Sequence, residues 1–140
     1  MQVRNCVPCL LGLEGPISDE LRKLGIPNIA SENGRVYFDG GEREIAKANI
    51  CLRIGERVLT EIGRFRAVTF DELFEKVKAL PWEAFLPKDA AFPVKGYCLN
   101  SVLMSVPDCQ KIIKKAIVER LKLKYHVSWF EETGPVHQIQ

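Results

Sequence analysis

Apolar positions along residues 1–66 alternate between the two-residue repeat of strands and the three-to-four-residue repeat of helices. Asn33-Gly34 separates two short extended runs and is typical of a two-residue hairpin turn. The pattern predicts a strand over residues 3–11, a helix over 16–24, a hairpin of strands 28–32 and 35–39, a helix over 42–52 and a strand over 57–65. This order is that of the split βαβ, or ferredoxin-like, arrangement, which is an α+β fold.

The pattern changes after residue 66, which divides the chain into domains 1–66 and 67–140. The second half predicts a helix over 71–79, a break at 81–82, a strand over 92–99, a helix over 107–123 and a strand over 125–130. Residues 136–140 have the pattern of a further strand without a partner. We therefore expect an α/β domain truncated at its C-terminal end, with an open sheet edge through which two copies dimerise or exchange segments.

The composition is that of an ordinary globular protein. Of 140 residues, 46% are hydrophobic and 27% charged, unlike disordered or coiled-coil sequences. The longest apolar runs are far below the roughly 18 residues of a membrane-spanning helix, and no secretory signal is visible. We therefore expect a cytoplasmic protein with no membrane partner.

Positive charge is concentrated in one part of the chain. The net charge of +2 is by itself too small to indicate a nucleic-acid partner. The segment from Lys95 to Lys124, however, holds seven lysine or arginine residues against two acidic ones. The function of this basic segment is therefore the main question that the composition raises.

The predicted helix 107–123 has two different faces. One face holds Lys111, Lys114, Lys115 and Lys122, and the other holds Cys109, Ile112, Ile113, Ala116 and Ile117. A lysine face is usually a solvated surface, but a lysine stripe with no interleaved acid is also what binding to a phosphate backbone needs. Arg120 falls in the apolar arc, where it must reach out to water, cap the last carbonyls or pair with a carboxylate such as Glu131 or Glu132, and the sequence does not decide among these.

The residues before this helix form a second candidate anion site. Ser101 and Ser105 supply hydroxyl groups, and the helix start at residues 108–110 supplies free amides with partial positive charge. These groups suit a phosphate, and they equally suit ordinary capping of the helix. The local chemistry favours neither interpretation.

The five cysteines are expected to be free thiols that pack as small buried groups, because a chain without a secretory signal belongs in a reducing compartment. Cys6 and Cys9 form one Cys-x-x-Cys pair, so a redox or zinc protein is a further hypothesis for metal analysis and thiol titration to test. His126 and His137 complete neither a second ligand pair nor a catalytic triad. We therefore assign no metal-binding and no catalytic residue.

Several segments carry a family resemblance. They are Leu52-Arg53 with Arg57-Val58, TFDELF at 69–74, ALPW at 79–82, SVLMSVPDCQKIIKKAI at 101–117, and GLE at 12–14 with ENGRV at 32–36. Together they resemble the THUMP-domain RNA methyltransferases, and most closely the bacterial large-subunit rRNA guanine-N2 methyltransferases. Members of that family begin with a ferredoxin-like domain, continue into a THUMP domain that helps to hold RNA, and end in a Rossmann-like domain that binds S-adenosylmethionine. The resemblance implies an N-terminal ferredoxin-like domain followed by an incomplete α/β THUMP domain.

The resemblance also implies which residues face RNA. By position they are Lys95, Ser101, Ser105, Gln110, Lys111, Lys114 and Lys115, with Arg64 and Arg66 extending that surface. The chain contains no glycine-rich adenosylmethionine loop and no Asn-Pro-Pro-Tyr tetrapeptide. We therefore expect no cofactor and no methylation in these residues, and we expect S-adenosylmethionine in a catalytic domain that this chain lacks.

Two functions of different class follow from these observations. In the first, the chain binds rRNA and presents it to a methyltransferase domain further along the same polypeptide. This predicts salt-sensitive binding, with a dependence that flattens by up to about three phosphate contacts when Lys111, Lys114 and Lys115 are removed together. In the second, the chain is a protein-interaction or regulatory module, which predicts salt-insensitive binding through an apolar patch.

Overall fold

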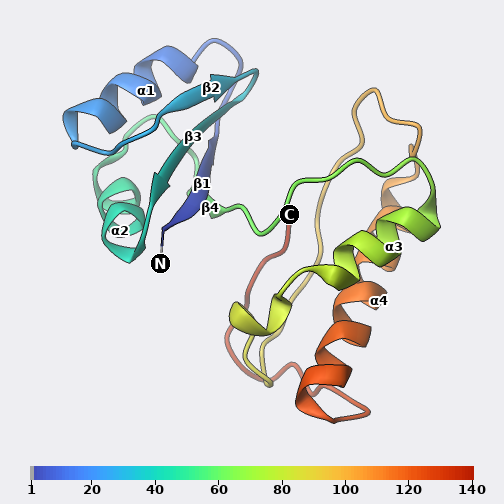
Figure 1. The fold of residues 1–140 in the computed structure, drawn as a ribbon. Helices are drawn as coiled ribbons and strands as arrows, with labels where there is room; N and C mark the ends of the chain where they lie inside the picture. The colour runs from blue at the N-terminus through green and yellow to red at the C-terminus, as the bar shows by residue number, and fades with distance from the viewer. Residues whose placement is uncertain (1) are drawn as a thin grey trace. The chain divides into compact units, whose positions relative to one another are not determined.

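A computed structural model describes residues 2–140 (Figure 1). The chain forms two compact units, which divide between Glu61 and Ile62. Each unit has its own apolar core. The first unit combines a sheet with two helices, and the second combines helices with a pair of extended segments.

The first unit is an antiparallel four-stranded sheet packed against two helices. Its elements are β1 (Val3–Pro8), α1 (Glu14–Lys23), β2 (Ala30–Glu32), β3 (Arg35–Gly40), α2 (Glu42–Cys51) and β4 (Leu59–Thr60). The strand order is β2-β3-β1-β4, and every neighbouring pair is antiparallel. The predicted ferredoxin-like arrangement and the α+β fold class are therefore confirmed, although the last strand is only two residues long.

Both helices share one core with the sheet. Ile17 and Leu21 of α1 and Ala48 of α2 are fully buried in a cluster with Val36 and Phe38 of β3. The two α1 residues are four positions apart, so they lie on the same face of the helix. Full burial of each large apolar side chain contributes roughly 1.5–3 kcal/mol, which makes this cluster the main source of stability in the unit.

Asn5 is a buried polar side chain in the middle of the sheet. Its Nδ2 donates to the carbonyl oxygens of Val3 and Gly40, each at 3.2 Å. Its Oδ1 accepts from the Thr60 hydroxyl at 3.1 Å. Asn5 therefore connects β1 to β3 on one side and to β4 on the other, which helps to keep the short β4 in the sheet.

Two of the segments that carry the family resemblance meet in the first unit. Glu14 accepts hydrogen bonds from the amides of Gly12 at 2.8 Å and Gly34 at 2.7 Å. Gly34 has a φ of +75°, the left-handed conformation that this hairpin turn requires. These hydrogen bonds lower the pKa of the Glu14 carboxyl, and the one from Gly34 has the largest effect. The GLE and ENGRV segments therefore hold the start of α1 against the hairpin.

The second unit is built around two long helices. Its helical elements are α3 (Phe70–Ala79), the short turn η1 (Trp82–Ala84) and α4 (Val106–Tyr125). Leu73 and Val77 of α3 share one core with Ala116, Ile117 and Leu121 of α4. The three α4 residues recur at helical spacing, so the apolar face predicted for this helix lies against the core.

The TFDELF and ALPW segments shape the two ends of α3. At its start the Thr69 hydroxyl oxygen accepts from the Glu72 amide at 3.1 Å, while the Glu72 carboxylate accepts from the Val68 amide at 2.8 Å. These two hydrogen bonds satisfy the Glu72 amide, which the first turn of the helix leaves free, and the Val68 amide just before the N-cap Thr69. After its end, the buried Trp82 indole donates to the Val77 carbonyl at 2.7 Å. Both segments therefore have a structural role.

The predicted strands 92–99 and 136–140 form only short bridged segments. They run parallel to each other, with bridges between Ala91 and Val136 and between Val94 and Ile139. The His137 amide donates to the Ala91 carbonyl at 2.7 Å, which belongs to the same ladder. The prediction that residues 136–140 lack a partner was wrong, and the reason for expecting dimerisation through that segment is lost.

Residues 125–130 do not form the predicted strand. Instead α4 continues through Tyr125, and His126 ends it in the left-handed conformation with a φ of +53°. The Tyr125 ring packs edge-on against the buried Phe130 ring, with 6.4 Å between ring centres. The Tyr125 hydroxyl donates to the Leu86 carbonyl at 2.7 Å. The apolar residues that suggested a strand therefore close one end of the core.

All five cysteines are free thiols in this structure. Cys6 is buried as expected, Cys9, Cys98 and Cys109 are half-buried, and Cys51 is exposed, so the expectation of buried thiols is confirmed in full for Cys6 alone and is wrong for Cys51. Within residues 2–140, no three His, Cys, Asp or Glu side chains are grouped closely enough to hold a metal ion. A search of the same residues finds no helix with the length and apolar character needed to span a membrane.

Candidate nucleic-acid interface

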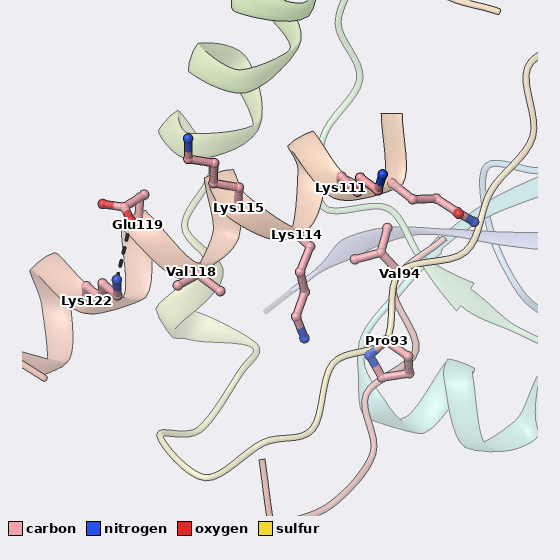
Figure 2. Close-up of a pocket in the computed structure, with 9 residues that line it drawn as sticks. Pro93, Val94, Lys111, Lys114, Lys115, Val118, Glu119 and Lys122 are labelled. Atoms are coloured by element: carbon pink, nitrogen blue, oxygen red, sulfur yellow. Dashed lines mark hydrogen bonds and ion pairs between the residues drawn. The ribbon is translucent and has the colours of Figure 1, made fainter. Parts of the chain in front are cut away.

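A pocket of about 600 Å³ lies along α4 in the second unit (Figure 2). It is lined by Pro93, Val94, Gln110, Lys111, Lys114, Lys115, Val118, Glu119 and Lys122. We call this set the lysine pocket. Four ammonium groups outnumber the carboxylate of Glu119 in the lining and that of Glu132 beside Lys114, and this excess of positive charge attracts anions.

The helical repeat explains why these lysines meet. Positions 114 and 115 follow position 111 by three and four residues, and position 122 follows 115 by seven, so all four recur on one side of α4. The shared lysine face predicted from the sequence is confirmed, because all four side chains line the same pocket. On the opposite side of α4, Ala116 and Ile117 are fully buried.

Lys114 is held by contacts within the protein. Its Nζ lies 2.8 Å from Glu132 Oε1 and donates to the Phe92 carbonyl at 3.0 Å. The same ammonium lies 3.6 Å from the centre of the Phe92 ring. Its side chain is 32% exposed and that of Glu132 is 34% exposed. The sequence-based picture of a lysine stripe without acidic neighbours is therefore wrong for Lys114, and it is wrong for Lys122 too, because Glu119 of the same lining lies 3.5 Å from that ammonium.

Glu132 is the residue that fixes this arrangement. Its backbone adopts a φ of +51°, and its Oε2 accepts from the Phe92 amide at 3.3 Å. One carboxylate therefore contacts both α4, through Lys114, and the extended segment that supplies Pro93 and Val94. Glu132 and Lys114 together join the two sides of the lysine pocket.

Replacing Lys114 by methionine tests this structural role. Methionine keeps the apolar stem but removes the ion pair and the cation over the Phe92 ring, so we expect the free energy of unfolding to fall by about 1 kcal/mol. Urea denaturation of the single variant, Glu132→Gln and the double variant measures the coupling between the pair. Strictly additive effects of the two substitutions would contradict the assignment.

The other three lysines are more available to a ligand. Lys111 and Lys115 are exposed, and among residues 2–140 no hydrogen bond or ion pair to Lys111 is found. Lys115 points toward α3, with its Nζ 6.0 Å from the centre of the Phe74 ring. Lys122 lies 3.5 Å from Glu119 one turn earlier, a half-exposed pair of small energetic value. Lys111 and Lys115 are therefore the strongest candidates for direct anion contacts.

The remaining basic candidates lie outside the pocket lining. Lys95 follows the lining residue Val94, and its side chain is exposed while its amide donates to the Ile139 carbonyl at 2.8 Å. Arg64 and Arg66 are exposed in the segment that precedes α3. Lys95 can extend the pocket, whereas the two arginines are not among its lining residues.

The serine site at the start of α4 is not assembled as an anion site. The Ser105 hydroxyl donates to Asp108 Oδ2 at 2.6 Å, and Ser101 Oγ accepts from the Leu103 amide at 3.2 Å. Neither serine lines the lysine pocket. Because the Asp108 carboxylate lies in the first turn of α4, its charge opposes a phosphate there. Ser105 makes no capping hydrogen bond to the helix amides either.

Arg120 pairs with a carboxylate, but with neither of those expected. Its Nε and Nη2 donate to the two oxygens of Glu83 at 2.9 and 2.6 Å. Lys124 lies 3.6 Å from the same carboxylate. The Arg120 hydrogen bond is the largest cause that lowers the pKa of Glu83 to about 2, and Glu83 in turn raises the pKa of Arg120. Of the three alternatives that the sequence leaves open, the structure shows pairing with a carboxylate, and the partner is Glu83 of η1 and not Glu131 or Glu132.

The structure thus gathers four of the nine predicted RNA-facing residues. These are Gln110, Lys111, Lys114 and Lys115. Sequence reasoning placed Lys122 on the same face but did not assign it a role, and it missed Pro93, Val94, Val118 and Glu119. The spacing of residues 118, 119 and 122 along the helix is a signal that could have found the α4 members.

Two family models match the chain, one in each unit. The model described as the RlmL ferredoxin-like domain matches residues 5–59, and the THUMP domain model matches residues 67–140. The fold and the two family matches together define an α+β protein in which a ferredoxin-like domain precedes a THUMP domain. Because the THUMP model covers more than half of the chain, the chain belongs to the THUMP-domain family.

Longer proteins contain similar regions. The chain is 45% identical over 132 residues to YpsC of Bacillus subtilis, a protein provisionally named an RNA methyltransferase, with 93% of this chain and 34% of YpsC covered. It is 28% identical to the ribosomal RNA large subunit methyltransferase K/L of Psychromonas ingrahamii, over 83% of this chain and 16% of that protein. A Listeria monocytogenes crystal structure, described as a predicted N6-adenine-specific DNA methylase, has a TM-score of 0.94 and 47% identity over 99% of this chain and 36% of its own. The chain therefore spans about a third or less of these proteins.

Proposed function

We propose that this chain is the RNA-binding portion of an S-adenosylmethionine-dependent methyltransferase that modifies guanine N2 of large-subunit rRNA. The observation that carries the proposal is the lysine pocket on the THUMP domain, with four lysines against one glutamate. The printed names of YpsC and of the K/L methyltransferase support an RNA substrate and, for the second, rRNA. Because rRNA is the substrate, the proposal also implies a cytoplasmic protein.

The chemistry of the pocket suits a polynucleotide. Lys111 and Lys115 supply mobile ammonium groups for phosphate oxygens, and the neutralised phosphates release counterions. Gln110 offers an amide that both donates and accepts, which suits a base edge or a ribose 2′-hydroxyl. Pro93 and Val118 add apolar contact surface for sugars and bases. The catalytic step, and S-adenosylmethionine as its methyl donor, belong to a domain outside these residues.

Fluorescence anisotropy with labelled large-subunit rRNA fragments tests the proposal on the whole chain. We expect affinity to fall with salt in proportion to roughly two to three phosphate contacts, because Lys111, Lys115 and partly Lys122 are available. A DNA duplex of the same length is the comparison, and we expect it to bind more weakly. Binding that is absent, or that does not change between low and high salt, would contradict an RNA-binding pocket.

One observation favours a second function, that of a protein-interaction module. The segment between Lys95 and Ser105 exposes the apolar side chains of Tyr97, Leu99, Val102 and Met104, at 61% to 76% each. Exposed apolar groups of this kind mark protein contact sites. The salt series separates the two functions, because binding through such a segment strengthens or stays constant as salt rises, whereas RNA binding weakens.

A further inference from the structure

Two cysteines of the second unit lie side by side without a disulfide bond. Cys98 and Cys109 have their Sγ atoms 3.9 Å apart, within hydrogen-bonding distance for sulfur. Both side chains are half-buried, and both are free thiols. Cys98 lies in the irregular segment that precedes α4, and Cys109 lies in the first turn of that helix. The fold therefore brings together two nucleophilic groups that the RNA-binding role does not use.

We propose that Cys98 and Cys109 form a reversible disulfide, with a low-molecular-weight disulfide of the glutathione class as the oxidant. One thiolate of the pair attacks a sulfur of oxidised glutathione, which forms a mixed disulfide and releases one glutathione thiolate. The second thiolate then attacks the protein sulfur of the mixed disulfide and releases the other glutathione thiolate. Two protein thiols are oxidised, one glutathione disulfide is reduced to two thiols, and their protons come from the two cysteines.

The geometry permits this bond with a small movement. A disulfide joins sulfur atoms about 2.05 Å apart, so the two Sγ atoms must approach by roughly 2 Å. Residues 95–105 form neither helix nor strand, and Asn100 within them has a φ of +49°. Leu99, next to Cys98, is 75% exposed, whereas Leu103 packs against the core of the second unit, so the movement has to come from the part of the segment near Cys98. The segment can therefore supply the approach while α4 stays in place.

The environment of Cys109 slows its reaction with an oxidant. Burial raises the pKa of the Cys109 thiol, and the hydrogen bond with Cys98 and the charge of Asp108 raise it further. A thiol with a raised pKa is mostly protonated at neutral pH and reacts slowly, since the thiolate is the nucleophile. Cys51 differs from both cysteines because it is exposed on α2, which makes it a reference thiol in the same chain.

The bond would connect directly to the lysine pocket. Gln110 and Lys111 follow Cys109 along α4 and line the pocket. A disulfide between positions 98 and 109 would fix the exposed apolar segment to the first turn of the helix, at the end of the pocket where Lys111 lies. The inference does not rest on RNA binding, because the bond is detected without any ligand.

Incubation of the whole chain in glutathione buffers of rising oxidised fraction tests the proposal. Remaining thiols are blocked by alkylation, and peptides are analysed by mass spectrometry. We expect a peptide pair linked through Cys98 and Cys109, lighter by two hydrogen atoms than the two free thiols and restored by dithiothreitol. In the same sample we expect Cys51 to carry glutathione. Free or separately glutathionylated Cys98 and Cys109 under conditions that modify Cys51 would overturn the proposal.

Single substitutions sharpen the test. In Cys109→Ser the reaction should stop at the mixed disulfide on Cys98, because position 109 no longer supplies the neighbouring thiol that releases the glutathione. Cys98→Ser provides the reciprocal test if Cys109→Ser does not fold. The matched control is Cys51→Ser, in which the Cys98–Cys109 bond should form to the same extent as in the unsubstituted chain. Loss of the bond in Cys51→Ser would assign it to a different cysteine pair.

Discussion

Replacing Lys111 and Lys115 together by glutamate is expected to lower the affinity of the chain for RNA by about 100-fold at moderate salt, which corresponds to roughly 2.7 kcal/mol. Both side chains are exposed, both line the lysine pocket, and neither forms an ion pair among the described residues. Their loss should also flatten the salt dependence by about two phosphate contacts. Fluorescence anisotropy over a salt series measures both quantities.

The control is a variant with the same change in net charge at two positions outside the pocket lining. Lys23 on α1 and Lys88 in the second unit are exposed and lie outside the pocket lining. The double variant Lys23→Glu and Lys88→Glu makes the same change in net charge but leaves every lining residue of the pocket in place, so it should lose much less affinity than the pocket variant. If this variant loses as much affinity as the pocket variant, net charge rather than the pocket is responsible.

Lys114 is left out of this pair of substitutions for a structural reason. Its ammonium already contacts Glu132, the Phe92 carbonyl and the Phe92 ring, so its charge is largely satisfied within the protein. Removing it would mix a loss of stability with a loss of binding. The three-lysine test that the sequence alone suggests is therefore best divided, with Lys111 and Lys115 tested for binding and Lys114 for stability.

Local sequence patterns were sufficient for most of the fold. Hairpin formation at Asn33-Gly34, the inward face of α1 and the two faces of α4 depend on residues close together in the sequence, and all three are present in the structure. The strand predicted over residues 125–130 is absent because the structure of this segment depends on contacts with residues far away in the sequence. Its apolar residues suit either an exposed strand or a core-closing turn, and the choice depends on tertiary contacts of Tyr125 with Leu86 and Phe130.

In the candidate site, too, the residues that local patterns position could be predicted, and those that depend on distant contacts could not. The lysines of α4 could be predicted because one helix positions them, whereas Glu132 reaches Lys114 from 18 residues away and Glu83 reaches Arg120 from 37 residues away. No periodicity in a single sequence encodes such pairs. The segments that carry the family resemblance were informative about fold for a related reason: GLE, ENGRV, TFDELF and ALPW make caps and contacts that hold elements in place.

Glu83→Gln is expected to destabilise the second unit by about 2 kcal/mol at neutral pH, the usual scale for losing hydrogen bonds to a charged group. Glutamine preserves the shape of the side chain but removes the negative charge that faces both Arg120 and Lys124. Urea denaturation measures the change. The same substitution at Glu75, an exposed residue of α3, is the matched control and should leave the free energy of unfolding nearly unchanged.

The stabilisation by Glu83 should also depend on pH in a defined direction. Folding lowers the pKa of Glu83 from 4.5 to about 2, so the unfolded chain binds this proton more readily than the folded chain does. The contribution is therefore complete above about pH 4.5 and is lost as the pH falls toward 2. Other carboxylates titrate in both proteins, so the informative quantity is the difference in unfolding free energy between the unsubstituted chain and Glu83→Gln, which should shrink over this interval. A difference that stays constant down to pH 2 would show that the loss at neutral pH comes from packing and not from the charge of Glu83.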